Sequence, residues 1–238
     1  MATQVKTMDR PWGTVYTYEE IKAAVEKYKP TVLALVHAET STGSCQPFDG
    51  VGDLCRKHNC LLIADCVTSI SGVPLYLDKW GIDAAYAGTQ KVLLFYSVVL
   101  PFHCALFGLA LRPLELELDT KHTVWHTREL RHLCRLGPDM RHEQALSCPP
   151  GVAPLSFSPR AMEKLMNRKT PVANWYLDMR MIASYLTGSG GGARSYHHTA
   201  PISMCYALRE ALELVKEEGL ETRWARHREV AEHFWKQV

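Results

Sequence analysis

The sequence lacks the features that mark several specialised protein classes. Its eight cysteines in 238 residues are too sparse for a disulfide scaffold, and they contain no CxxC pair. Neither sign of charge dominates, because 27 Lys and Arg stand against 25 Asp and Glu, so no broad basic surface for nucleic acid is expected. The first residues lack the apolar core of a signal peptide. With 47% apolar and 22% charged residues, the composition indicates an intracellular globular protein.

Two groups of possible metal ligands have better explanations than a zinc site. Four cysteines crowd residues 45–66, a pattern typical of small buried apolar side chains in a reducing compartment. His122, His126 and Cys134 have suggestive spacing, but only one thiol follows the histidine pair. We therefore predict no metal site.

Apolar runs that alternate with amphipathic stretches predict a parallel α/β sheet. Thr17 and the following glutamates indicate a capped helix that ends at Pro30. Residues 31–36 are predicted to form a strand buried on both faces, and 60–64 a second buried strand. The remaining predicted elements are a helix over 50–59, a strand over 82–87, a strand over 153–157, a helix from Ser158, and helices over 175–186, 201–218 and 221–238.

Residues 92–145 do not follow this alternation of apolar runs and amphipathic stretches. Residues 92–111 carry no charge and are long enough to span a bilayer, but Pro101, His103 and Gly108 weaken that interpretation. A membrane span there would also split a sheet whose strands lie on both sides. We expect 92–145 to be a poorly ordered insertion within one domain formed by residues 1–91 and 146–238.

Three polar positions follow predicted strands and should meet at one edge of the sheet. Asp65 ends a buried strand, Lys91 follows Gly88-Thr89-Gln90 after another, and residues 39–43 offer hydroxyls and backbone N–H groups. A carboxylate, a lysine and a hydroxyl-bearing turn are what a pyridoxal phosphate site needs. Spacing alone leaves two other interpretations open, a solvated lysine and an aspartate that caps the next helix.

Several separate motifs, in order, resemble the class V aminotransferases of pyridoxal-phosphate fold type I. The resemblance covers about residues 1–91 and 147–238. It rests on His37-Ala-Glu-Thr-Ser-Thr-Gly43, Gln46-Pro-Phe-Asp-Gly50, Leu61-Leu-Ile-Ala-Asp65, Gly88-Thr-Gln-Lys91, Cys148-Pro-Pro-Gly151, Phe157-Ser-Pro-Arg160, Arg168-Lys-Thr170, Tyr176-Leu-Asp178 and Tyr196-His-His-Thr199. It implies a homodimeric transaminase that passes the amino group of L-alanine or L-serine to glyoxylate, giving glycine and pyruvate. Its substrates would be a small amino acid and a 2-oxo acid.

The resemblance assigns the catalytic and ring-binding roles. Lys91 matches the lysine that holds pyridoxal 5′-phosphate and moves the substrate proton, which requires a neutral, desolvated amine. Asp65 matches the partner of the ring nitrogen. Thr40 stands where the family has a serine that contacts the ring and its phenolic oxygen. The substitution keeps the hydroxyl.

The resemblance also assigns the phosphate contacts. Gln90 matches one such contact. Tyr196 and Thr199 match contacts that reach over from the other subunit of a dimer. The alternative for Tyr196-His197-His198 is an ordinary polar loop or a metal pair.

Departures from the family pattern lead us to expect that the 238-residue chain is not itself an active transaminase. The family's Gly-rich phosphate cup, its ring-stacking aromatic residue and its substrate-carboxylate arginine have no counterpart here. Joining Leu93 to Ser147 would restore the family pattern, so 92–145 is best explained as an unspliced or mistranslated segment, with an acquired loop as the weaker alternative.

Two alternatives to this function remain open. Another class V enzyme, such as a cysteine desulfurase or a kynureninase, would share Asp65 and Lys91. A non-enzymatic membrane-associated fragment would rest on residues 92–111 alone. The resemblance implies a peroxisomal location, or a mitochondrial one as the alternative.

Overall fold

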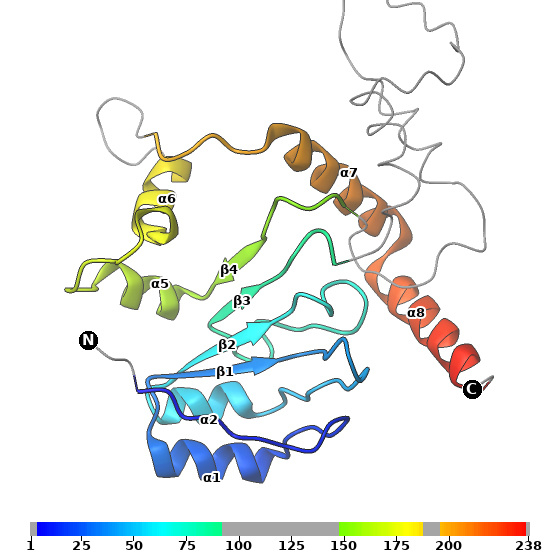
Figure 1. The fold of residues 1–238 in the computed structure, drawn as a ribbon, viewed down its shortest axis with the longest axis horizontal. Helices are drawn as coiled ribbons and strands as arrows, with labels where there is room; N and C mark the ends of the chain where they lie inside the picture. The colour runs from blue at the N-terminus through cyan, green and yellow to red at the C-terminus, as the bar shows by residue number, and fades with distance from the viewer. Residues whose placement is uncertain (1–3, 92–147, 188–195, 237–238) are drawn as a thin grey trace, which may run out of the picture.

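One four-stranded sheet lies at the centre of the computed structural model, which describes residues 4–91, 148–187 and 196–236. The strands β1 (Val32–Val36), β2 (Leu61–Asp65), β3 (Ala84–Tyr86) and β4 (Leu155–Phe157) are adjacent in that order (Figure 1). The first three run parallel, and β4 is antiparallel to β3. The predicted α/β fold with a mainly parallel sheet is confirmed.

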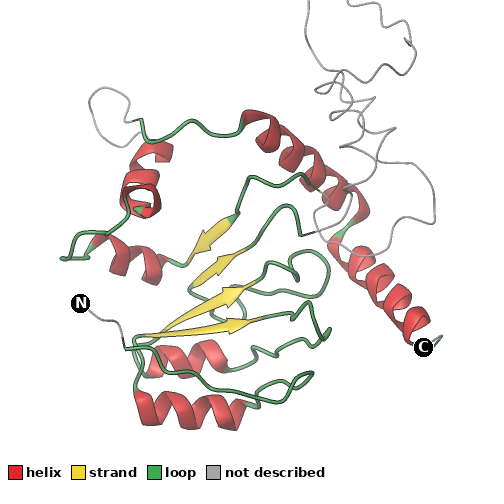
Figure 2. Cartoon of the chain, viewed as in Figure 1, coloured by secondary structure: helices red, strands yellow, loops and turns green. Residues whose placement is uncertain are grey.

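Two helices pack on one face of the sheet. Helix α1 (Tyr18–Tyr28) begins with the predicted capping box, in which Thr17 and Glu20 satisfy each other's backbone N–H groups. Helix α2 (Val51–Lys57) lies beside α1, and Figure 2 shows both helices on the same side of the strands. Their apolar side chains form the main core with β2 and its neighbours: Ile21, Val25, Phe48, Val51, Leu54, Cys55, Leu62, Ala64, Ile82 and Ala85. The helices therefore fix which face of each strand is buried.

The prediction that residues 31–36 are buried on both faces is wrong. Leu33 and Leu35 point into the core that α1 and α2 cover, whereas Val32 and Val36 are 44% and 46% exposed. Ala34, which lies on the same face as Val32 and Val36, is exposed as well. Because side chains alternate along a strand, covering one face buries only every second residue.

The elements after β4 are helical and lie outside the sheet. Helix α5 (Pro159–Met166) begins at the predicted Ser158, whose hydroxyl accepts from the N–H of Ala161. The single helix predicted over 175–186 is instead a 3-10 turn, η2 (Trp175–Leu177), followed by α6 (Met179–Thr187). Asp178 separates the two because its extended backbone interrupts the helix while its side chain accepts from the N–H of Arg180.

Two long helices complete the described chain. Helix α7 (Ile202–Glu218) ends at Gly219, which has a left-handed φ of 81°, and α8 (Leu220–Trp235) follows at once. Ala211 and Val215 of α7 pack with Cys148 against Ile70. The ring of Trp224 in α8 meets the edge of Tyr76 at 5.8 Å. The two helices therefore contact the connection between β2 and β3.

Asp83 links the starting ends of β2 and β3 to the segment after β4. Its carboxylate is 2% exposed and accepts from Leu62 N–H at 2.9 Å, Ser158 Oγ at 2.9 Å and Arg160 Nε at 3.0 Å. Burial alone raises the pKa of Asp83, but these donors outweigh it, so the pKa lies below its usual value. The buried charge is thereby stabilised at the edge of the sheet opposite the predicted site.

The chain leaves and re-enters the sheet at neighbouring positions around residues 92–147. The Thr89 hydroxyl is within hydrogen-bond distance of two carbonyl oxygens, Pro149 O at 2.9 Å and Val152 O at 3.0 Å, and Thr89 N–H donates to Val152 O at 3.2 Å. Residues 92–147 lie outside the described residues. The predicted insertion over 92–145, with its uncharged run 92–111 and its histidine pair, falls in this range. In the described ranges, no helix is both long and apolar enough to cross a membrane.

Candidate functional site

The carboxyl ends of β1, β2 and β3 are level with one another. Val36 pairs with Asp65 and Asp65 with Tyr86, so the three strands finish in one row. The backbone ladder continues one step further, because His37 N–H donates to Asp65 O and Cys66 N–H donates to Tyr86 O, each at 2.9 Å. The loops that carry Thr40 and Lys91 therefore leave the same edge of the sheet as Asp65, as the sequence predicted (Figure 1).

Asp65 is held by a donor on each carboxylate oxygen. Val67 N–H donates to Oδ1 at 2.9 Å, a turn in which the side chain caps the chain that follows it. The Tyr86 hydroxyl donates to Oδ2 at 2.6 Å. Turns, and no helix, follow Asp65 directly, so its side chain caps a turn where the sequence suggested a helix cap, and the carboxylate lies at the end of the sheet with both oxygens hydrogen-bonded.

Thr40 lies in a compact turn after β1. Gly43 N–H donates to Glu39 O at 2.9 Å, and Gly43 has a left-handed φ of 70° that favours glycine. Ser41 N–H also donates to the Glu39 carboxylate and lowers its pKa. The turn is tied to the neighbouring loop because Thr68 Oγ1 donates to Ala38 O at 2.6 Å. Thr40 itself is exposed, so its hydroxyl is accessible to a ligand.

Gln90 and Lys91 follow the anchored Thr89 and are both exposed. Gly88 leaves room for Gln90, because a Cβ at position 88 would lie 3.1 Å from Oε1 of Gln90. The desolvated environment expected for Lys91 is not present in the described structure. A solvent-facing lysine loses water when a ligand or further chain covers it.

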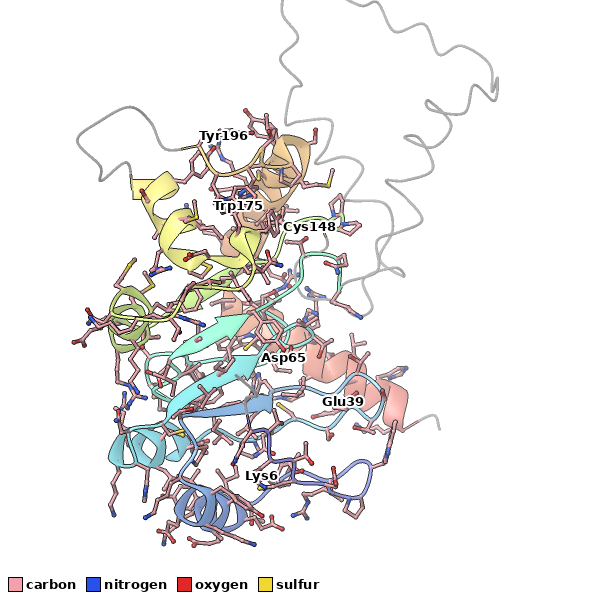
Figure 3. The ribbon with its side chains drawn as sticks, turned by 60° about the vertical axis from the view of Figure 1, so that its left-hand side comes forward. Lys6, Glu39, Asp65, Cys148, Trp175 and Tyr196 are labelled. Carbon is pink, nitrogen blue, oxygen red and sulfur yellow. The ribbon has the colours of Figure 1, made fainter. Side chains whose placement is uncertain are left out.

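Tyr196 and Thr199 belong to a different part of the chain. Their hydroxyls hydrogen-bond to each other, and Tyr196 is 67% exposed. His197 between them is buried and stacks on Trp175 with ring centroids 4.3 Å apart. Figure 3 shows Tyr196 well away from Asp65, whereas Glu39 lies at the same end of the sheet as Asp65. One chain therefore brings together Thr40, Asp65 and the loop of Lys91, but not Tyr196 and Thr199.

The donor set at the sheet edge fits pyridoxal 5′-phosphate. The Asp65 carboxylate, held by a donor on each oxygen, is a suitable hydrogen-bond partner for a protonated ring nitrogen. The exposed hydroxyl of Thr40 lies in the loop after β1, and the exposed amine of Lys91 lies in the loop after β3, so the two loops flank β2 and its Asp65. No group of three His, Cys, Asp or Glu side chains in the described ranges could hold a metal ion.

Sequence reasoning missed two residues that shape this edge. The sequence predicts only that Tyr86 lies in a strand. Its hydroxyl contacts Asp65, and this hydrogen bond, followed by burial, raises the pKa of Tyr86 to about 12. The motif Gly88-Thr89-Gln90-Lys91 indicates no role for Thr89, which is fully buried and links the chain before residues 92–147 to the chain after them. The pairing register that places Tyr86 beside Asp65 has no signal in a single sequence.

Comparison with known proteins identifies relatives of the whole described fold. Residues 3–94 match the family Aminotransferase class-V. Alanine–glyoxylate aminotransferase of Oryctolagus cuniculus is 34% identical over all of this chain, which covers 47% of that relative. (S)-Ureidoglycine–glyoxylate transaminase of Bacillus subtilis is 30% identical over 94% of this chain and 44% of the relative. The chain thus spans about half the length of the curated relatives it matches.

Solved structures give the same result. The crystal structure of alanine–glyoxylate aminotransferase from Nostoc sp. matches 97% of this chain and 46% of its own length, with a TM-score of 0.70 and 41% identity. Ureidoglycine–glyoxylate aminotransferase from Bacillus subtilis matches 93% of this chain and 42% of its own length, with a TM-score of 0.66 and 32% identity.

Proposed function

This chain belongs to the class-V aminotransferases, which are pyridoxal-phosphate enzymes of fold type I, and on that premise we propose that it contributes to amino transfer from L-alanine or L-serine to glyoxylate. The products would be pyruvate or hydroxypyruvate from the donor, and glycine from glyoxylate. The observation that carries the proposal is the fixed carboxylate of Asp65 at the sheet edge from which the Lys91 loop also departs.

The choice of glyoxylate rests on what the relatives share. The names of the Oryctolagus cuniculus and Bacillus subtilis relatives both include glyoxylate but give different amino donors. The acceptor is therefore better supported than the donor.

Each residue of the edge has a definite task in this proposal. Bound pyridoxal phosphate supplies an electron sink for the pair of electrons released when the amino acid loses its α-proton. Asp65 keeps a negative charge beside the ring nitrogen and so holds a proton there. Lys91 Nζ takes the proton from the substrate α-carbon and returns a proton after the electrons have moved. Thr40 donates its hydroxyl to the phenolic oxygen, and Gln90 binds the phosphate.

Lys91 must lose water before it can act as a base. Its exposure in the described structure means that the ligand itself, or chain packed over it, has to exclude water when the site fills. Exclusion of water favours the neutral form of an amine, which is the form that can accept a proton.

Tyr196 and Thr199 act, in this proposal, on the site of a second copy of the chain. The separation of Tyr196 from Asp65 in Figure 3 supports this, because the pair cannot serve the edge of its own chain. Light scattering with size-exclusion chromatography tests for the homodimer. The proposed location, peroxisomal or alternatively mitochondrial, rests on the resemblance alone and is tested by imaging a tagged protein.

Borohydride trapping tests the assignment of Lys91. The 238-residue chain is incubated with excess pyridoxal 5′-phosphate, reduced, digested and mapped by mass spectrometry, a procedure that also captures weak binding. We expect the label on Lys91 and its loss in Lys91→Ala, while Lys57→Ala, which removes an exposed lysine at the end of α2, leaves the label unchanged. Labelling spread evenly over the exposed lysines would overturn the assignment.

Product analysis separates the transaminase from its alternatives. Pyruvate from L-alanine together with glycine from glyoxylate supports the proposal at any detectable turnover, whereas turnover comparable to that of an intact relative would contradict the expected inactivity of the 238-residue chain. Sulfide from L-cysteine, or anthranilate from kynurenine, in the absence of pyruvate from L-alanine would favour the other class-V activities.

A further inference from the structure

Tyr86 and Asp65 form a cross-strand pair at the end of β2 and β3. They are direct partners in the parallel register, and the Tyr86 hydroxyl donates to Asp65 Oδ2 at 2.6 Å. Tyr86 is 39% exposed. It therefore contacts the proposed site from a position that a ligand can reach.

The geometry of this contact is that of a charge-assisted hydrogen bond. A distance of 2.6 Å lies in the range for a hydroxyl that donates to a carboxylate, which is shorter and stronger than a bond between neutral groups. Because Val67 N–H holds Oδ1, the two donors together fix the plane of the carboxylate. Without the Tyr86 hydroxyl, only the bond from Val67 N–H would hold the carboxylate.

We propose that Tyr86 is a positioning residue for pyridoxal phosphate, because its hydroxyl holds the Asp65 carboxylate in the orientation that meets the ring nitrogen. This inference rests on the proposed role of Asp65. Each carboxylate oxygen keeps a further lone pair for the ring N–H after it has accepted one bond. Tyr86 thus shares Asp65 with the ligand and does not compete with it.

The ionisation of Tyr86 agrees with this arrangement. The hydrogen bond to Asp65 comes first and burial second among the causes that raise its pKa to about 12. A phenolate at position 86 would lose its bond to Asp65 and face a second negative charge. Tyr86 should therefore remain protonated, and able to donate, well above neutral pH.

The first test needs no cofactor. At pH 11 a phenol with a pKa of about 12 is roughly one tenth ionised, whereas one with an ordinary pKa near 10 is roughly nine tenths ionised. Absorbance at 295 nm should therefore show additional phenolate in Asp65→Asn relative to wild type, by less than one full tyrosine because burial still raises the pKa of Tyr86, with circular dichroism to confirm that both remain folded. An equal number of phenolates in the two proteins would overturn the inference.

The second test follows the ring nitrogen of ¹⁵N-labelled pyridoxal phosphate by NMR at saturating cofactor. In wild type we expect a protonated nitrogen, in Asp65→Asn loss of protonation, and in Tyr86→Phe a signal between the two with about tenfold weaker binding. Tyr76→Phe is the matched control, since Tyr76 is 41% exposed and packs against Trp80 and Trp224. A purely structural role of Tyr86 would change the urea midpoint but leave the nitrogen signal unchanged.

The outcomes separate the two proposals. Failure of the wild-type chain to bind the cofactor overturns the proposed function and this inference with it. Binding by wild type, together with a Tyr86→Phe variant whose affinity and nitrogen signal equal those of wild type, overturns the inference alone.

Discussion

Asp83→Ala is expected to be among the most destabilising single substitutions in the described fold. Asp83 is 2% exposed, and its carboxylate accepts from Leu62 N–H, the Ser158 hydroxyl and the Arg160 guanidinium. In the backbone, Asp83 N–H donates to Leu62 O and Ser158 N–H donates to Asp83 O, each at 2.8 Å. Removing the side chain leaves three donors without their acceptor while the backbone bonds remain. The perturbation is therefore confined to the buried charge and its partners.

The magnitude follows from the burial of each partner. Removing one member of a buried ion pair typically costs about 3–5 kcal/mol. The Arg160 side chain is 26% exposed, so water can solvate part of the abandoned guanidinium, which favours the lower end. We expect a loss of about 3 kcal/mol in the free energy of unfolding. At about 2–4 °C per kcal/mol for a chain of this size, the melting temperature should fall by roughly 6–12 °C.

Urea denaturation of the 238-residue chain, followed by circular dichroism, measures this loss. Asp78→Ala is the matched control because Asp78 is exposed and lies in the same connection between β2 and β3, so a change below about 0.5 kcal/mol is expected. The folded pKa of Asp83 is lowered, so its stabilisation is complete above the unfolded pKa near 3.9 and disappears as pH falls through the folded pKa. Equal stability of the two variants at pH 7 would refute the reasoning.

One further substitution and one deletion test the connection around residues 92–147. Thr89→Val should lower the free energy of unfolding by about 1–2 kcal/mol, because the isosteric side chain lacks the buried hydroxyl that faces Pro149 O and Val152 O. Urea midpoints measure this loss, and Thr89→Ser, which keeps the hydroxyl, is the control. Deleting residues 94–146 should preserve a cooperative urea transition, because Thr89 and Pro149 are already hydrogen-bonded and the remaining connection has an ordinary loop length. A transition that becomes non-cooperative on deletion would contradict this prediction.

Local sequence signals determined the element types well. The capping box at Thr17 and the Ser158-Pro159 helix start depend only on residues within one turn, and both are found as predicted. The burial of residues 31–36 could not be predicted in this way. An apolar run indicates that both faces can be buried, but which face is covered depends on where α1 and α2 pack, and that is decided by contacts distant in sequence.

The residues of the site likewise differ in whether local sequence or long-range pairing places them. Asp65 and Lys91 could be placed at one edge because parallel strands end together. Tyr86 could not, since its contact with Asp65 depends on the register between β2 and β3. Helical spacing of apolar residues over 175–186 predicts one continuous helix. Asp178 ends η2 because its side chain accepts from the N–H of Arg180 at the start of α6, a position that aspartate favours.

The register between β2 and β3 links the stability of the fold to the chemistry proposed for the site. Asp83 fixes that register at one end of the strands, through two bonds to Leu62, and the Tyr86–Asp65 pair lies at the other end. Since side chains alternate along a strand, a slip of one residue would move Tyr86 to the opposite face of the sheet and away from Asp65. The buried contacts of Asp83 with Leu62 therefore support the hydrogen bond from Tyr86 to the Asp65 carboxylate at the opposite end of the strands. It follows that weakening Asp83 should reduce cofactor affinity only under conditions in which the pairing of the strands is itself disturbed.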